Sequence, residues 1–321
     1  MKKLSAYARL SILLVVLLSL SFFISYRQSS ALHPVVKTCA VQASTYVICL
    51  KNSMFDFSVA HPSKISNMLS DTFKQARLVQ PIDLRALSET SHEIGMTLSI
   101  KGSYSLLTGV QYCGLYFTGS CIHGFVMEEL EKSDVKARYS SNLLNYCDSL
   151  NTNKYELYYM NCLHGVGHEL WAQNNTSLDD TLNLCVPATT FKFKSACMSG
   201  IFMEYSKGGK REGFHSHAPV GKVSLPCSGM GDNFKASVCY AAMGSYLQYE
   251  PDTEPLQNTY ASCSNSPSNY QEACFNEVAY RMLLSTGNNK YAALRTCHTL
   301  KIKYVNFCQK AVDKVYKKDL I

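Results

Sequence analysis

Cys121-Ile-His-Gly-Phe-Val-Met-Glu128, Cys162-Leu-His-Gly-Val-Gly-His-Glu169 and Cys197-Met-Ser-Gly-Ile-Phe-Met-Glu204 are three versions of one eight-residue motif. Each has a cysteine at its first position, a glycine at its fourth and a glutamate at its eighth. Weaker versions begin at Cys239, Cys274 and Cys308. A motif that recurs in one register along the chain indicates a repeated structural unit.

Each motif cysteine is the second member of a pair whose two cysteines are 8 to 15 residues apart. From the second pair onward, the first cysteines of successive pairs lie 34, 38, 42, 36 and 34 residues apart. Periods of this size are typical of helical-hairpin repeats. The pairs are Cys39 and Cys49, Cys113 and Cys121, Cys147 and Cys162, Cys185 and Cys197, Cys227 and Cys239, Cys263 and Cys274, and Cys297 and Cys308.

The even count of fourteen cysteines fits full pairing, and in an exported chain it favours disulfides over reduced thiols. We predict that neighbouring cysteines pair, so that each bridge ties the end of one helix to the start of the next. Closing such a loop contributes about 3 kcal/mol in the chain-entropy model. The alternative is a set of long-range bridges between repeats.

These features predict an all-α fold, a helical-hairpin repeat array (an α-solenoid) with one local disulfide in each repeat. We expect residues 32–84 to form an N-terminal helical segment and residues 85–321 to form the repeats. In architecture, residues 85–321 resemble disulfide-stapled helical repeat proteins of the Sel1 and TPR type. The chain lacks the glycine and alanine signature of Sel1 repeats, so the resemblance implies stacked hairpins and no particular function.

The N-terminus has the pattern of an export signal. Lys2, Lys3 and Arg9 precede an apolar stretch over residues 10–26, and small residues at 29–31 offer a cleavage point. We therefore predict a signal peptide over residues 1–31 and a periplasmic, extracellular or lumenal location. The alternative is an uncleaved anchor helix, the one case in which we expect a membrane as a partner.

Charge and missing motifs exclude several classes of function. The net charge is +7, but four of the basic residues lie in the predicted signal, which leaves about +3 (7 minus 4) for the rest. This is too weak a field to indicate nucleic-acid binding. The chain also has no G-x-S-x-G, P-loop, dinucleotide fingerprint or C-x-x-C motif.

Turning the motif helix by 100° per residue separates two faces. In the motif at Cys162, positions one, four, five and eight after the cysteine carry Leu163, Val166, Gly167 and Leu170, and we predict that they face the core. The second and sixth positions form a non-core face and carry His123 and Met127, His164 and His168, then Ser199 and Met203. His92 and Met96 repeat the spacing earlier in the chain, where no cysteine marks their register.

His164 and His168 are the sharpest indication of chemistry, because two imidazoles four residues apart on a helix can bind one metal ion. In a solenoid, equivalent positions of neighbouring helices lie side by side. We therefore expect side chains at these positions in the other repeats to contribute further ligands to the same metal. Glu169 is the candidate general base beside a metal-bound water. The predicted metal ligands are His92, His123, His164, His168, Glu128 and Glu204.

Imidazole with carboxylate suits a divalent metal such as zinc, iron or manganese, and we favour zinc or iron. Copper is the weaker choice, since it depends on thioether ligands from Met96, Met127 and Met203, and methionine at helical spacing is usually core filler. Each feature also has an interpretation without a metal. The histidines would then lie at the edge of the core, and the glutamates would form hydrogen bonds with the next loop. Gly124, Gly165 and Gly200 would allow the helices to pack closely.

Two further features carry weaker hypotheses. His215 and His217 lie in a polar insertion over residues 207–226, which we interpret as a solvated loop with a functional role as the alternative. Asn174 and Asn175 are the first residues of two overlapping N-glycosylation sequons. They would carry a glycan only in an organism that glycosylates its secreted proteins.

The sequence thus supports two functions. The first is an exported metal-binding protein and possible metalloenzyme that uses the His/Glu/Met face of its first repeats. The second is a non-catalytic scaffold whose concave surface binds a protein, peptide or glycan, for which the 21 tyrosines are suitable contact residues. Because the His/Met/Glu face is confined to the first repeats, the pattern favours a localised metal site.

Overall fold

The computed structural model describes residues 33–39, 46–79, 84–115, 119–132, 143–173, 177–206, 227–247, 255–285 and 289–319. This part of the chain is helical and has no strand, which confirms the predicted all-α class. Among its helices, none has both the length and the apolarity needed to cross a bilayer. The predicted signal, both sequons, and His215 and His217 lie outside the described residues.

The chain forms two compact units, Met1–Asp83 and Leu84–Ile321. The described part of the first unit contains α2 (Pro34–Cys39), α3 (Tyr46–Ala60), the short 3-10 helix η1 (Pro62–Lys64) and α4 (Ile65–Val79). Its core includes Val36, Leu50, Met54 and Met68, all fully buried, and the Cys39–Cys49 disulfide joins α2 to α3.

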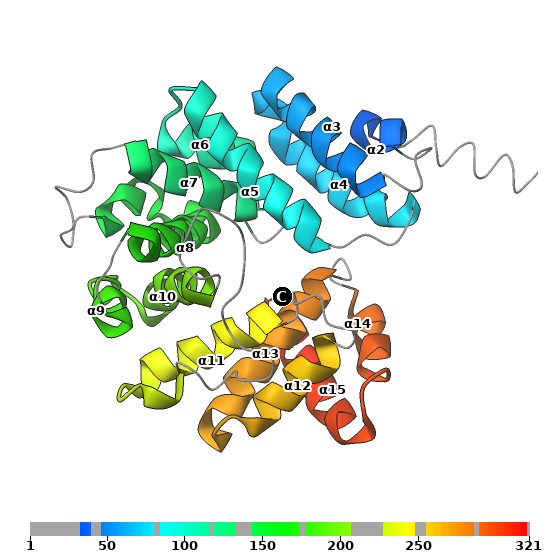
Figure 1. The fold of residues 1–321 in the computed structure, drawn as a ribbon, viewed down its shortest axis with the longest axis vertical. Helices are drawn as coiled ribbons and strands as arrows, with labels where there is room; N and C mark the ends of the chain where they lie inside the picture. The colour runs from blue at the N-terminus through cyan, green and yellow to red at the C-terminus, as the bar shows by residue number, and fades with distance from the viewer. Residues whose placement is uncertain are drawn as a thin grey trace, which may run out of the picture. The chain divides into compact units, whose positions relative to one another are not determined.

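The second unit is built on a row of long helices, each of which packs against the next one in the chain (Figure 1). These are α5 (Leu84–Lys101), α7 (Ser120–Lys132), α8 (Glu156–Gln173), α10 (Phe191–Ser206), α11 (Asn233–Leu247), α13 (Ser268–Ser285) and α15 (Ile302–Asp319). Short helices lie between them, namely α6 (Leu106–Cys113), η4 (Leu144–Leu150), η5 (Asn153–Tyr155), α9 (Leu178–Asn183), η6 (Cys227–Gly229), α12 (Pro255–Asn265) and α14 (Lys290–Cys297).

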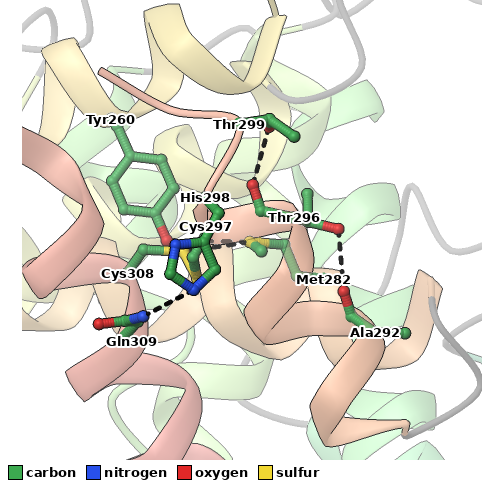
Figure 2. Close-up of a disulfide and its surroundings, with 9 residues drawn as sticks. All are labelled: Tyr260, Met282, Ala292, Thr296, Cys297, His298, Thr299, Cys308 and Gln309. Atoms are coloured by element: carbon green, nitrogen blue, oxygen red, sulfur yellow. Dashed lines mark hydrogen bonds between the residues drawn. A yellow bond between two sulfur atoms is a disulfide. The ribbon is translucent and has the colours of Figure 1, made fainter. Parts of the chain in front are cut away.

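All seven predicted disulfides are confirmed, with Cα–Cα distances of 5.3 to 5.9 Å, and no cysteine is free. In the second unit each bridge joins a short helix, or the turn after it, to the long helix that follows. The last of them, Cys297–Cys308, lies beside Met282 and Tyr260 (Figure 2). There the Tyr260 hydroxyl donates to the Met282 sulfur at 3.8 Å, and burial raises the pKa of this tyrosine. The seven disulfides indicate an oxidising environment outside the cytosol.

Glycines bring two pairs of long helices into backbone contact. A Cβ built on Gly95 of α5 would lie 1.9 Å from the carbonyl oxygen of Cys121, and one on Gly124 of α7 would lie 2.0 Å from that of His92. The helix pair α8/α10 repeats this arrangement. A Cβ built on Gly167 would lie 2.0 Å from the carbonyl oxygen of Cys197, and one built on Gly200 would lie 2.1 Å from that of His164. Helix α5 is therefore the counterpart of α8, and His92 occupies the position of His164.

The helix faces are only partly as predicted. The core face is confirmed, because Leu163, Val166 and Leu170 are buried. The face predicted to lie outside the core is buried in part as well, since His123, Met127 and His168 have exposed fractions of 2 to 6%. The physical reason is that α7 and α8 each pack against a long helix on both sides, so neither has a free face.

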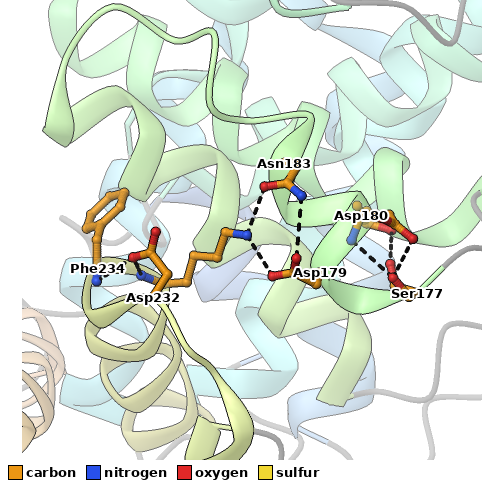
Figure 3. A network of polar contacts seen from close by, with 8 residues as sticks. Ser177, Asp179, Asp180, Asn183, Asp232 and Phe234 are labelled. Atoms are coloured by element: carbon orange, nitrogen blue, oxygen red, sulfur yellow. Dashed lines mark hydrogen bonds and ion pairs between the residues drawn. The ribbon is translucent and has the colours of Figure 1, made fainter.

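A buried lysine joins the repeat that contains α9 to the following one. Lys235 of α11 contacts Asp179 at 2.6 Å and Asn183 at 2.8 Å, both on α9. Asp232 accepts the backbone N–H groups of Phe234 and Lys235, which starts α11 at this point (Figure 3). An ammonium group that is mostly buried needs such partners, so this network fixes α11 against α9.

Candidate metal centre

Three histidines from two neighbouring helices converge in the second unit. His123 belongs to α7, and His164 and His168 lie one turn apart on α8. The ring of His123 lies 4.4 Å from that of His164 and 5.7 Å from that of His168, and the two α8 rings are 4.8 Å apart, measured between centroids. One ring nitrogen from each histidine lies within 4.8 Å of those of the other two.

The cluster is shielded from solvent. His123 and His168 are buried, and so is the Nε2 atom of His164. Gly165 makes room for it between the helices, since a Cβ there would lie 3.1 Å from the Val126 side chain and 3.3 Å from the Cα of His123. A side chain larger than that of alanine at this position would push α8 away from the histidine of α7.

Asn161 holds the ring of His123. Its amide nitrogen donates to the carbonyl oxygen of Leu157 at 2.8 Å, which turns its Oδ1 atom toward Nε2 of His123 at 3.0 Å. An amide oxygen can only accept, so Nε2 carries the proton. Nδ1 of His123 is then the unprotonated nitrogen of the neutral ring, the form that a metal ligand requires.

Ser199 holds the ring of His164 in a similar way. The serine hydroxyl donates to the carbonyl oxygen of Ala196 at 2.8 Å, so its oxygen accepts from Nδ1 of His164, also at 2.8 Å. Since Nδ1 carries the proton, Nε2 is the unprotonated nitrogen of the neutral His164 ring.

Glu204 holds the third ring. Its Oε2 atom lies 2.9 Å from Nδ1 of His168, and a carboxylate in this position accepts the proton of that nitrogen. Nε2 of His168 is then the unprotonated nitrogen of the neutral ring. A carboxylate behind a histidine that binds a metal is a common second sphere, because it orients the ring and makes the opposite nitrogen a stronger ligand.

The other predicted site residues lie around the three histidines. His92 of α5 has its ring 6.4 Å from that of His168, and the group of three does not include it. Glu204 contacts the far nitrogen of His168, while Glu128 is half-buried on α7. Glu169, the predicted base, is buried directly after His168. Of the methionines, Met127 is buried, and Met96 and Met203 are half-buried.

Sequence reasoning missed two residues of the site. Ser199 occupies the same motif position as His123 and His164, and this shared position is the signal that marks it. Asn161 precedes the motif by one residue, so the repeat pattern does not distinguish it from any other helical asparagine.

Comparison with known proteins adds no relative: no family model, curated protein or solved structure matches the chain. The resemblance to Sel1 and TPR repeats therefore depends on the spacing of cysteines and helices alone.

Proposed function

We propose that this protein binds one divalent transition-metal ion through Nδ1 of His123 and Nε2 of His164 and His168. The observation that carries the proposal is that all three rings are held from behind, by Asn161, Ser199 and Glu204. Partners of this kind are the usual second sphere of metal-binding histidines, because they orient each ring and fix which of its nitrogens carries the proton.

The spacing of the donor atoms supports this proposal. Nitrogens that bind a tetrahedral zinc ion at about 2.0–2.1 Å are about 3.3–3.4 Å from one another. One ring nitrogen from each histidine lies within 4.8 Å of those of the other two, so the rings are close enough to share one ion after they turn toward it. Imidazole nitrogens suit zinc or iron, and they favour copper(I) less than thioether ligands would.

Three protein ligands leave one coordination position for water or another ligand, as in catalytic zinc sites. Glu169 follows the ligand His168, and its Oε2 atom is buried. We propose Glu169 as the general base that would activate a metal-bound water for hydrolysis. We also propose that the chain is exported by its N-terminal signal and that the second unit is an α-solenoid, which the disulfides and the order of helix packing support.

Elemental analysis of the purified protein tests the metal site. After incubation with zinc and removal of the excess, we expect one metal ion per chain. We expect none in the His164→Ala/His168→Ala variant. The matched control is His298→Ala, because His298 is exposed at the end of α14 and should not affect the metal content. Wild-type protein without stoichiometric metal, or a double variant that retains it, would contradict the proposal, provided that circular dichroism shows a folded protein.

The role of Asn161 gives a second prediction. Replacing Asn161 with leucine removes the acceptor behind His123, so we expect the affinity for zinc to fall by about 10- to 100-fold, as is typical of second-sphere changes. Asn161→Asp keeps an acceptor oxygen and should retain most of the affinity. Competition with a chromophoric chelator measures both values. Equal affinities for the leucine variant and the wild type would show that Asn161 does not position the ligand.

A further inference from the structure

Positive charge is concentrated in the helices α14 and α15. Residues 289–319 contain eight basic and two acidic residues, which gives a net charge of +6 (8 minus 2). The whole chain carries +7 and residues 1–31 carry +4, so residues 32–288 sum to −3 (7 minus 4 minus 6). A basic segment in a chain that is otherwise weakly acidic indicates a surface for an anionic partner.

Helix α15 separates this charge from its apolar side chains. It packs on α13 and α14 (Figure 1), and the residues that it buries there are Tyr304, Cys308, Ala311, Val312 and Val315. Its exposed face carries four lysines that fall within an arc of about 60° at 100° per residue and extend over about 21 Å of the helix. They are Lys303, Lys310, Lys314 and Lys317. Helix α15 therefore presents a row of positive charge to solvent.

Acidic side chains do little to neutralise this row. Asp313 of α15 pairs with Lys290 of α14 at 2.6 Å. Glu272 of α13 pairs with Lys314, but both side chains are more than half exposed, so water and salt weaken the pair. Among the described residues, the other three lysines of the row form no ion pair. Most of the positive charge is thus available to a partner.

Two exposed apolar side chains lie beside the lysines. Ile302, the first residue of α15, is 90% exposed, and Phe307 is 48% exposed. At 100° per residue they fall on opposite sides of the lysine arc. A soluble polyanion would contact the lysines but offers no apolar layer to Ile302. Basic and apolar side chains on one exposed face are instead typical of surfaces that lie in the interface of a membrane with anionic lipids.

We propose that the exposed face of α15 binds the surface of a membrane that contains anionic lipids. The lysines contact the headgroups, and Ile302 and Phe307 enter the boundary between the headgroups and the acyl chains. This contact is separate from the anchor helix that is the alternative to a signal peptide, and it holds the second unit at a membrane without a spanning segment. It is also independent of the metal site, because no residue of that site belongs to α15.

Co-sedimentation of the full chain with lipid vesicles tests the proposal. One set of vesicles contains phosphatidylcholine alone, and the other contains phosphatidylcholine and phosphatidylglycerol in equal parts. The measured quantity is the ratio of the two partition coefficients, because an uncleaved N-terminal segment would bind both sets alike. Each lysine near an anionic surface strengthens binding about fivefold. We therefore expect a high ratio for the wild type and a ratio about 100-fold lower for Lys303→Gln/Lys310→Gln/Lys317→Gln.

The matched control is Lys101→Gln/Lys154→Gln/Lys192→Gln, which removes the same charge from exposed lysines of α5, η5 and α10. It should leave the ratio nearly unchanged. Circular dichroism confirms that both triple variants are folded, which we expect because all six side chains are exposed. A wild type without preference for anionic vesicles, or equal losses in the two triple variants, overturns the proposal.

Ile302→Ser separates a membrane from a soluble polyanion. Because Ile302 is 90% exposed, the substitution should not affect folding. We expect it to weaken binding to the anionic vesicles about tenfold, since the apolar side chain no longer leaves water. Binding to dextran sulfate, a soluble polyanion, should not change. If the serine variant binds the anionic vesicles as well as the wild type does, the row recognises charge alone and the membrane proposal is wrong.

Discussion

Replacing Gly200 with alanine will destabilise the protein by about 3 kcal/mol or more, a larger loss than typical overpacking causes. The new Cβ would lie 2.1 Å from the carbonyl oxygen of His164 and 3.0 Å from the backbone nitrogen of His168. Both neighbours are backbone atoms of α8, so no side-chain rotation can relieve the clash. Helix α10 must move away from α8, and Ser199 and Glu204 move with it. We therefore expect a lower unfolding midpoint together with weaker zinc binding.

Two other glycines provide matched controls in urea unfolding. A Cβ at Gly165 would meet the side chain of Val126 at 3.1 Å, which can shift, and alanine in a helix gains about 1 kcal/mol over glycine. Gly165→Ala should therefore change the stability by no more than about 1 kcal/mol. At Gly231 nothing lies within 4 Å of the new Cβ, so Gly231→Ala should leave the midpoint unchanged. Similar midpoints for the Gly200 and Gly231 variants would contradict the close packing of α8 and α10.

The disulfides could be predicted from the sequence because they are local. When two cysteines are 8 to 15 residues apart and the pairs recur with one period, local pairing is simpler than any long-range scheme. The same cysteines mark the register of the motif helices, which brings His123 next to His164. The spacing of four residues between His164 and His168 then follows from helix geometry.

The remaining parts of the site depend on contacts between helices, which a repeat pattern does not contain. Burial of His168 follows from the neighbours on both sides of α8, and the apolar pattern of a single helix shows only one of them. Helix α5 has no cysteine, so only the contacts of Gly95 and Gly124 fix its register. They reveal that α5/α7 and α8/α10 are equivalent pairs, in which Met96 occupies the position of His168.

Removing the Cys147–Cys162 disulfide will weaken both the fold and the metal site. Its loop spans 15 residues, so a Cys147→Ala/Cys162→Ala variant should lose about 3 kcal/mol of stability in the chain-entropy model. Alanine is the suitable replacement, because both cysteines are fully buried and a serine hydroxyl would need a partner there. Cys162 lies two residues before His164, so the bridge also fixes the turn of α8 that carries the ligands. We expect the affinity for zinc to fall at least tenfold.

The Cys297–Cys308 disulfide is the control for this prediction, since it closes a loop of similar size, 11 residues, in the last repeat of the same unit. Its removal should cost about the same stability in the chain-entropy model, because that cost depends on the loop rather than on what the loop positions. It should leave the affinity for zinc unchanged, because α14 and α15 contribute no residue to the site. Calorimetry of unfolding and chelator competition measure the two effects on the same samples. A similar loss of affinity in both variants would mean that general destabilisation, and not the position of α8, controls the metal site.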